Sequence, residues 1–212
     1  MDLDFIFWDN DGVLVDTEGL YYQASREALA TIGFHLTAAQ FTAISLATGR
    51  SVFELATQDP RLMDELRQWR NERYSQLLAE QNLLLPGVRA TLTQLSAHLR
   101  MAIVTSSRRD HFDLIHARTG LLHLFDFILC REDYREAKPD PEPYRLALQR
   151  SGVPPASCLV IEDSARGLAA AKAAGLTCWV IPSPQTAGQD FSAADRVLER
   201  IEALPELLFR TR

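Results

Sequence analysis

The stretch Phe5–Gly12, FIFWDNDG, decides the fold of this 212-residue chain. Its first four residues are all apolar, which is typical of a strand buried on both faces of a parallel sheet. Asp9 and Asp11 follow at once, and the carboxyl ends of strands are where an open α/β sheet carries its active site. Two carboxylates this close repel unless a cation lies between them or one is protonated. The pattern indicates a metal site with a nucleophile and a general acid, although a simple acidic turn produces the same short motif.

Five further strands are predicted beyond residue 84, and helices separate them. The expected strands are Met101–Val104, Phe125–Leu129, Leu159–Ile161, Thr177–Ile181 and Arg196–Leu198. Strands that alternate with helices imply right-handed crossovers and a parallel sheet. The predicted fold class is therefore α/β, a doubly wound parallel sheet interrupted by an inserted α-helical bundle.

Residues 16–83 contain helix signals and no strand candidate. Capping boxes are predicted at Thr37 with Gln40 and at Ser51 with Glu54. Asp59–Pro60 reads as the start of a long helix. We therefore expect residues 16–83 to form a small helical domain, inserted into a core domain made of residues 1–15 and 84–212.

Composition limits the classes of function. With 47% hydrophobic residues the chain can bury a proper core, and its net charge of −6 gives no basic footprint for nucleic acid. No apolar stretch is long enough to cross a bilayer, and the N-terminus lacks a basic leader. The three cysteines have no metal-type spacing, which predicts reduced core thiols. We expect a cytoplasmic monomer that binds neither nucleic acid nor membrane.

Polar side chains follow three of the predicted strands. They are Asp9 and Asp11 after the first, Thr105 and Ser106 after the second, and Glu162 and Asp163 after the fourth. Lys138, one of only two lysines, lies in the loop before a predicted helix. Parallel strands present these ends at one edge of the sheet. Oxygen ligands suit Mg²⁺, hydroxyls and N–H groups hold phosphate oxygens, and a lysine offsets their charge, so this set matches phosphoryl transfer.

Four motifs in order along the chain resemble those of haloacid dehalogenase (HAD) superfamily hydrolases that carry a helical cap. They are Asp9–Glu18, Val104–Ser106, Lys138–Pro141, and Ile161–Ser164 followed by Gly167. The resemblance covers essentially the whole chain. Within this superfamily the chain is similar to the branch of β-phosphoglucomutases and phosphoglycolate phosphatases. This resemblance implies a Rossmann-like core with residues 16–83 as the cap.

The resemblance implies a phosphatase that forms an aspartyl-phosphate. Asp9 would be the nucleophile, and Asp11 would serve first as general acid and then as general base. Mg²⁺ would be held by Asp9, by the backbone carbonyl of Asp11 and by Asp163. Glu162 is a possible further ligand, directly or through water.

The resemblance also implies the contacts to substrate. Thr105 would donate to the phosphoryl oxygens, Ser106 would contribute its backbone N–H, and Lys138 would stabilise charge on the nucleophile and the phosphate. In the cap, the loop containing Arg50 is the expected contact to the rest of the substrate, with a plain helix connection as the alternative. The partner expected is a small phosphorylated metabolite.

Comparison with other groups of the family reduces the number of activities expected for this chain. Haloacid dehalogenases lack the second acid of the first motif, which is present here as Asp11. Phosphonate-cleaving relatives need a cap lysine, and no lysine lies between residues 15 and 85. β-Phosphoglucomutases carry a histidine where this chain has Tyr21. We therefore expect a phosphatase of a sugar phosphate or a phosphoglycolate-like acid. The alternatives are a β-phosphoglucomutase-like phosphomutase and a catalytically silent HAD-fold binding protein.

Three histidines lie on or near one predicted helix: His111, His116 and His123. Their spacings of five and seven residues put no pair one turn apart on a single helix face. The sequence therefore predicts surface histidines rather than a metal site.

Overall fold

The computed structural model describes residues 3–209. The core is a six-stranded sheet in the order β3-β2-β1-β4-β5-β6, with every neighbouring pair parallel. The strands are β1 (Phe5–Trp8), β2 (Arg100–Val104), β3 (Phe127–Leu129), β4 (Cys158–Glu162), β5 (Thr177–Val180) and β6 (Arg196–Val197). This sheet, together with the helices that connect its strands, confirms the predicted α/β class.

Strand β1 lies near the middle of the sheet, between β2 and β4, and all four of its residues are buried. Phe5 and Phe7 point into a cluster that includes Tyr144 and Leu168, from the helices covering one face of the sheet. Burial on both faces explains why the strand is apolar throughout. It also delivers Asp9 and Asp11 to the centre of the sheet's carboxyl edge.

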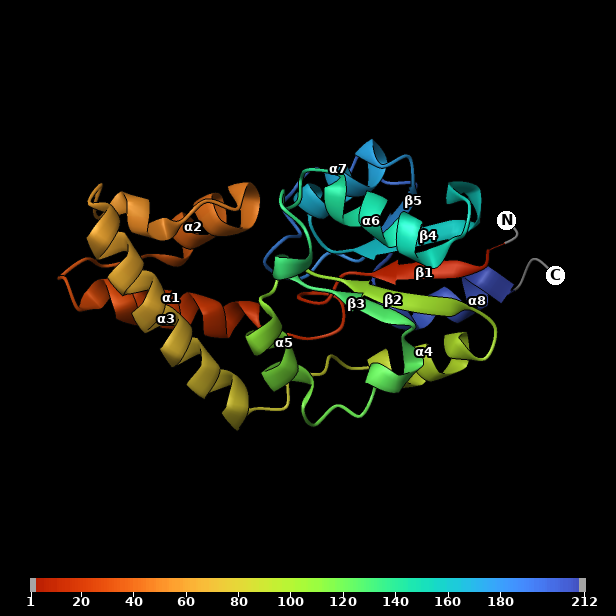
Figure 1. Cartoon of the computed structure of the whole chain (residues 1–212), viewed down its shortest axis with the longest axis horizontal. Helices are drawn as coiled ribbons and strands as arrows, with labels where there is room; N and C mark the ends of the chain where they lie inside the picture. The colour runs from red at the N-terminus through yellow and green to blue at the C-terminus, as the bar shows by residue number, and fades with distance from the viewer. Residues whose placement is uncertain (1–2, 210–212) are drawn as a thin grey trace. The chain divides into compact units, whose positions relative to one another are not determined.

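The core helices form layers on both faces of the sheet. They are α4 (Val88–Ser96), α5 (Arg109–His116), α6 (Glu142–Ser151), α7 (Ala165–Ala173) and α8 (Leu204–Phe209). Figure 1 shows α6 and α7 on one side of the sheet and α4 and α5 on the other. Helix α8 packs against α4. This is the doubly wound arrangement in which the strand ends form the site.

The chain divides into two compact units: one is the chain up to Asp16 and from Leu83 onward, and the other is Thr17–Asn82. The ends of the first unit's two segments are joined by backbone hydrogen bonds. The N–H of Asp16 donates to the carbonyl of Leu83 at 2.8 Å, and that of Leu85 donates to Leu14 at 3.0 Å. The two segments of backbone that lead into and out of the inserted unit are therefore hydrogen-bonded to each other at its boundary.

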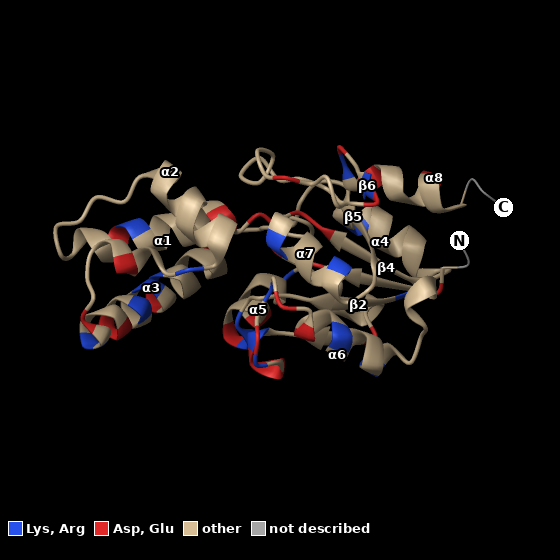
Figure 2. Cartoon of the chain, turned by 90° about the horizontal axis from the view of Figure 1, so that it is seen from above, with Lys and Arg blue, Asp and Glu red and all other residues tan. Residues whose placement is uncertain are grey.

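The inserted unit is helical. Its α-helices are α1 (Glu18–Ala30), α2 (Ala38–Phe41) and α3 (Pro60–Glu80), with α1 packed on α3. Its core contains Leu29, Phe41, Phe53 and Leu66, all buried. Figure 2 shows basic and acidic residues interspersed along α3, which matches ion pairs such as Arg67–Asp64.

Local details of this unit differ from the sequence predictions. The capping box of Thr37 and Gln40 is confirmed, but the helix that it starts becomes a π-helical turn at Thr42–Leu46. Ser51 caps a short 3-10 turn through the N–H of Phe53 at 3.4 Å. The predicted capping box at Ser51 is wrong: the Ser51 hydroxyl accepts from the N–H of Phe53 rather than from that of Glu54, and the carboxylate of Glu54 pairs with Arg50.

Two further observations concern the described residues as a whole. Among residues 3–209, no helix combines the length and the apolar character needed to span a membrane. The three cysteines, all within that range, are buried free thiols, as predicted: Cys130, Cys158 and Cys178.

Candidate active site

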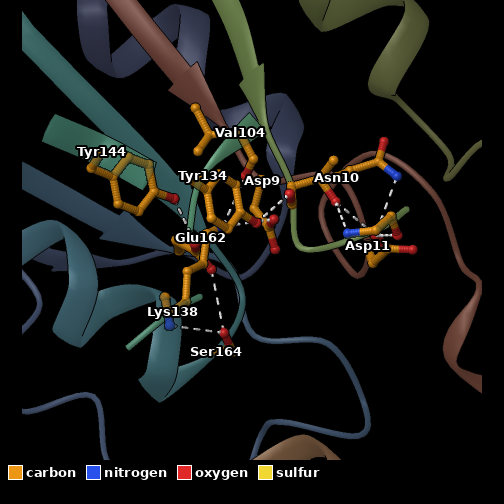
Figure 3. A network of polar contacts seen from close by, with 12 residues as sticks. Asp9, Asn10, Asp11, Val104, Tyr134, Lys138, Tyr144, Glu162 and Ser164 are labelled. Atoms are coloured by element: carbon orange, nitrogen blue, oxygen red, sulfur yellow. Dashed lines mark hydrogen bonds and ion pairs between the residues drawn. The ribbon is translucent and has the colours of Figure 1, made fainter. Parts of the chain in front are cut away.

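Lys138 is the centre of a buried polar cluster at the carboxyl edge of the sheet. Its Nζ donates to Asp9 Oδ1 at 2.9 Å, to Glu162 Oε1 at 2.6 Å and to the backbone carbonyl of Val104 at 2.9 Å. Its three donors therefore have partners from the ends of β1, β2 and β4 (Figure 3). The lysine side chain is 3% exposed, so these contacts are shielded from water.

Glu162 is held from several sides. The hydroxyl of Tyr144 donates to the same Oε1 at 2.6 Å, and the hydroxyl of Ser164 donates to Oε2 at 3.3 Å. A Cβ on Gly167 would lie 1.9 Å from this carboxyl group, so α7 approaches it only because residue 167 is glycine. Both carboxyl oxygens thus have protein donors, and the charge of Glu162 faces Lys138.

Burial and charge shift the pKa values of this cluster. Burial and the carboxylate of Glu162 raise the pKa of Asp9 to about 7, against the opposing effect of Lys138. Burial alone would lower the pKa of Lys138, but the carboxylates of Asp9 and Glu162 raise it above its ordinary value. Lys138 is therefore a permanent cation in this site.

Asp9, Glu162 and Asp163 each offer a carboxylate oxygen, and these oxygens lie within 4.8 Å of one another. With all three carboxyl groups ionised, they and the ammonium group of Lys138 would have a net charge of −2, which one Mg²⁺ neutralises. The hard oxygen donors at this carboxyl edge of the sheet are also the ligands that Mg²⁺ prefers. The residues present therefore fit a magnesium ion.

Gly12 lets the first motif approach Asp163. Its φ of +82° lies in the left-handed region, and a Cβ there would lie 2.3 Å from Asp163 Oδ2. An L side chain would be both strained and in collision with that carboxylate. The glycine after Asp11 is thus needed for the turn and for the acidic group beside it.

Asp11 lies in a second group of polar contacts. Its Oδ2 accepts from Ser107 Oγ at 2.7 Å, from Thr105 Oγ1 at 3.2 Å and from Asn10 Nδ2 at 3.3 Å. Figure 3 shows Asn10 beside Asp11, on the opposite side of Asp9 from the lysine cluster. Three donors on one oxygen fix the orientation of the carboxylate.

The contacts described so far include all but two of the site residues predicted from the sequence. The two others are Ser106 and Arg50. Ser106 is half-buried in the turn directly after Thr105. Arg50 belongs to the other unit, Thr17–Asn82, where its guanidinium pairs with Glu54. The core unit therefore brings its acidic residues, Thr105 and Lys138 to one edge, whereas Arg50 is held by a partner within its own unit.

Residues 6–181 match the haloacid dehalogenase-like hydrolase family. The chain belongs to this family. It is 34% identical to the protein CbbY of Rhodobacter capsulatus, over 98% of this chain and 100% of the relative. It is 31% identical to the fructose-1-phosphate phosphatase YqaB of Escherichia coli, over 81% of this chain and 92% of the relative.

A solved structure gives the same assignment. It is CbbY from Rhodobacter sphaeroides in complex with xylulose-(1,5)bisphosphate, at a TM-score of 0.84 and 29% identity, with 95% of this chain and 96% of that chain covered. These relatives confirm the predicted family and the prediction that the chain is a phosphatase.

The prediction for two of the three histidines is wrong. His123 is exposed, but His111 and His116 of this HAD hydrolase are buried. The spacing of two histidines bears on whether they can share a metal ion, but not on whether they are buried. Phe112 and Ile115 mark the buried face of α5, on which the two histidines also lie. That apolar pair was the available signal.

Other residues of the site were missed altogether. Tyr144 and Ser107 contact Glu162 and Asp11, and Asn10 contacts Asp11. Tyr144 lies on α6 and reads in the sequence as an ordinary apolar-face position. Ser107 lies one residue beyond the motif that resembles the family's second one, so its proximity to Thr105 was the only signal.

Proposed function

We propose that this HAD phosphatase is a magnesium-dependent enzyme that hydrolyses a phosphorylated sugar through an aspartyl-phosphate on Asp9. The observation that carries the proposal is the contact between Asp9 and Lys138, 2.9 Å apart in a buried site. A lysine beside a carboxylate favours its ionised, nucleophilic form and balances the charge of an incoming phosphate.

Asp9 and Asp11 divide the chemistry between them. The Asp9 carboxylate forms a bond to phosphorus while the bond from phosphorus to the sugar oxygen breaks, and Asp11 gives its proton to that oxygen. Asp11 then takes a proton from water as the water oxygen bonds to phosphorus, which releases inorganic phosphate and the free Asp9 carboxylate. Each group returns to its starting state after one turnover.

We assign the metal ligands to Asp9, Asp163 and the backbone carbonyl of Asp11. When bound, Mg²⁺ supplies positive charge to the phosphoryl oxygens. Both oxygens of Glu162 already accept hydrogen bonds from protein groups, so we assign Glu162 to holding Lys138 rather than to the metal. Thr105 and Ser106, at the end of β2, are proposed to contact the phosphoryl group.

Two relatives support the proposed substrate class. One is a fructose-1-phosphate phosphatase, and another has been solved with a sugar bisphosphate. We therefore favour a sugar phosphate over a phosphoglycolate-like acid. The helical unit Thr17–Asn82 is proposed to act as the cap that selects the substrate, with Arg50 as its candidate contact. A cytoplasmic location and a monomeric state stay predictions.

A phosphomutase is the second candidate. The β-phosphoglucomutases use a histidine where this chain has Tyr21. Here the Tyr21 hydroxyl accepts a 2.5 Å hydrogen bond from Arg70, and its ring packs edge-on against Tyr74. A phenol has no basic nitrogen to replace that of the histidine ring, which favours hydrolysis.

The test is phosphate release from a panel of sugar phosphates and small phosphorylated acids, with Mg²⁺ and with a chelator. Asp9→Asn is compared with Asp126→Asn, a surface aspartate of the same unit. Magnesium-dependent release that is lost only in Asp9→Asn supports the proposal. Interconversion of hexose phosphates without net phosphate release would establish the mutase instead. No reaction with any of these compounds would leave a binding protein as the remaining candidate.

A further inference from the structure

Asn10 lies between the two catalytic aspartates in the sequence, and its side chain is completely buried. Its amide has one partner on each side. Nδ2 donates to Asp11 Oδ2 at 3.3 Å, and Oδ1 lies 2.8 Å from Nε2 of His116. Buried amide groups are rarely left without such partners. Asn10 therefore connects the proposed acid–base residue to a histidine on α5.

His116 is distant from Asn10 in the sequence and almost wholly buried in the fold, at 3% exposure. Its Nδ1 lies 3.2 Å from Oγ1 of Thr119, and its ring packs on Phe112 with 4.4 Å between centroids. Both ring nitrogens thus have one polar partner each. The ring itself is fixed by packing.

Elementary hydrogen-bond chemistry determines which atoms donate and which accept in this series of contacts. Oδ2 of Asp11 accepts from Thr105, from Ser107 and from Nδ2 of Asn10, so the proton that Asp11 gives as general acid is carried on its other oxygen. The amide oxygen of Asn10 then faces His116 and can only accept, so Nε2 of the histidine must carry a hydrogen. A neutral ring leaves Nδ1 without one, so Nδ1 can only accept. The Thr119 hydroxyl lies 3.2 Å from Nδ1 and 3.1 Å from the backbone carbonyl of His116, and its single hydrogen serves these two acceptors. One tautomer satisfies every member.

The environment keeps the ring neutral. Burial lowers the pKa of His116 to about 4, although the carboxylate of Asp11 opposes the shift. At neutral pH the histidine is therefore uncharged, and its proton stays on one nitrogen.

We propose that His116, as the neutral Nε2–H tautomer, is a positioning residue that orients the Asn10 amide and, through it, the carboxylate of Asp11. The inference rests on the proposed acid–base role of Asp11. His116 touches no reacting atom. Its effect is to add a fixed third donor to the two hydroxyls, of Thr105 and Ser107, that reach the same carboxylate oxygen. Small misplacements of catalytic groups cost about 10²-fold in rate.

The first test uses the unmodified protein, so it needs no variant to fold. Nitrogen-15 NMR distinguishes a protonated ring nitrogen from an unprotonated one, and the His116 signals are assigned by their loss in His116→Gln. At pH 7 we expect a protonated Nε2 and an unprotonated Nδ1. An Nδ1–H tautomer or a charged ring at this pH would overturn the proposal.

The second test compares two substrates whose leaving groups differ in their need for a proton. A sugar alkoxide needs a proton from Asp11 as it leaves, whereas p-nitrophenolate needs almost none. His116→Phe should therefore lower kcat/KM for fructose 1-phosphate by about 10- to 100-fold but change that for p-nitrophenyl phosphate by less than about threefold. His116→Gln, which keeps an N–H donor, should recover most of the loss. His123→Phe, at an exposed histidine, is the matched control.

The outcomes separate this inference from the proposed function. Asp11→Asn should show the same dependence on the leaving group, and adding His116→Phe to it should cause no further loss. If Asp11→Asn lacks that dependence, the acid–base assignment fails whatever His116 does. If Asp11→Asn shows it but His116→Phe weakens both substrates equally, His116 has only a structural role and the inference is wrong.

Discussion

Nζ of Lys138 lies 2.9 Å from Oδ1 of Asp9, in a site where the lysine side chain is 3% exposed. The same ammonium group also reaches Glu162 at 2.6 Å. A buried cation between two carboxylates is expensive to remove, because the carboxylates are then left unpaired in a poorly solvated place. The two lysines of this chain allow that expectation to be measured with a control.

Lys138→Met should lower the free energy of unfolding by about 3–5 kcal/mol and abolish turnover. Lys172→Met should change stability by less than about 1 kcal/mol, because Lys172 forms only a surface ion pair with Asp195. Urea unfolding at pH 8 measures both values. Equal, small effects of the two substitutions would mean that the buried cluster is not held by Lys138.

Gly12→Ala should weaken both stability and metal binding. The left-handed backbone costs about 1–2 kcal/mol for an L residue. The new methyl group would in addition displace the carboxylate of Asp163, and we expect a loss in Mg²⁺ affinity of about tenfold or more.

Gly152→Ala is the control for Gly12→Ala. Gly152 has a φ of +68°, but nothing lies within 4 Å of its Cβ position. This substitution should lower stability alone, with Mg²⁺ affinity measured calorimetrically remaining as in the wild type. A normal affinity in Gly12→Ala would show that Asp163 does not need the space that glycine leaves.

Mg²⁺ affinity should rise with pH through the neutral range. Burial raises the pKa of Asp9 to about 7, and metal binding requires the deprotonated carboxylate. Ionisation therefore grows between pH 6 and pH 8, and the affinity should increase about tenfold over that interval. Isothermal titration calorimetry at several pH values measures it. Asp9→Asn should bind weakly and without this dependence, and an affinity that falls with pH in the wild type would contradict the assignment.

His116 should make the protein sensitive to acid. Its pKa is lowered from 6.5 to about 4, so the unfolded chain binds more protons than the folded one between these values. Stability from this group is complete above pH 6.5 and is lost as the pH falls toward 4, by up to about 3 kcal/mol.

His116→Gln removes that loss, so the stability difference between wild type and variant should shrink as the pH is lowered from 7 to 4.5. Denaturant unfolding of both proteins, with His123→Gln as the exposed control, measures the difference. A constant difference across this range would show that His116 is not held neutral in the folded state.

The sheet and its acidic edge followed from local patterns in the sequence. Apolar runs such as Phe5–Trp8 coincide with strands because burial on both faces permits few other residues. Asp9, Glu162 and Lys138 could be grouped without coordinates because parallel strands end at a common edge. In the structure Lys138 contacts both Asp9 and Glu162 at that edge.

What the sequence did not reveal depends on contacts between distant segments. The apolar face of α5 signals that His116 is buried, but its pairing with Asn10, 106 residues earlier, is encoded by no local pattern. The capping box at Ser51 failed because Glu54 has a competing partner in Arg50. The role of Tyr144 likewise depends on Glu162, which α6 reaches only in the folded sheet.

Direct detection of a phosphoryl group on Asp9 tests the proposed mechanism most sharply. The protein is mixed with Mg²⁺ and the best sugar phosphate of the panel, quenched in acid at short times and analysed by peptide mass spectrometry. We predict one added phosphoryl group on the peptide containing Asp9, formed before phosphate is released and absent in Asp9→Asn, whose turnover falls by about 10³-fold or more. Phosphate release with no phosphorylated Asp9 peptide at any time, and with activity retained in Asp9→Asn, would contradict it.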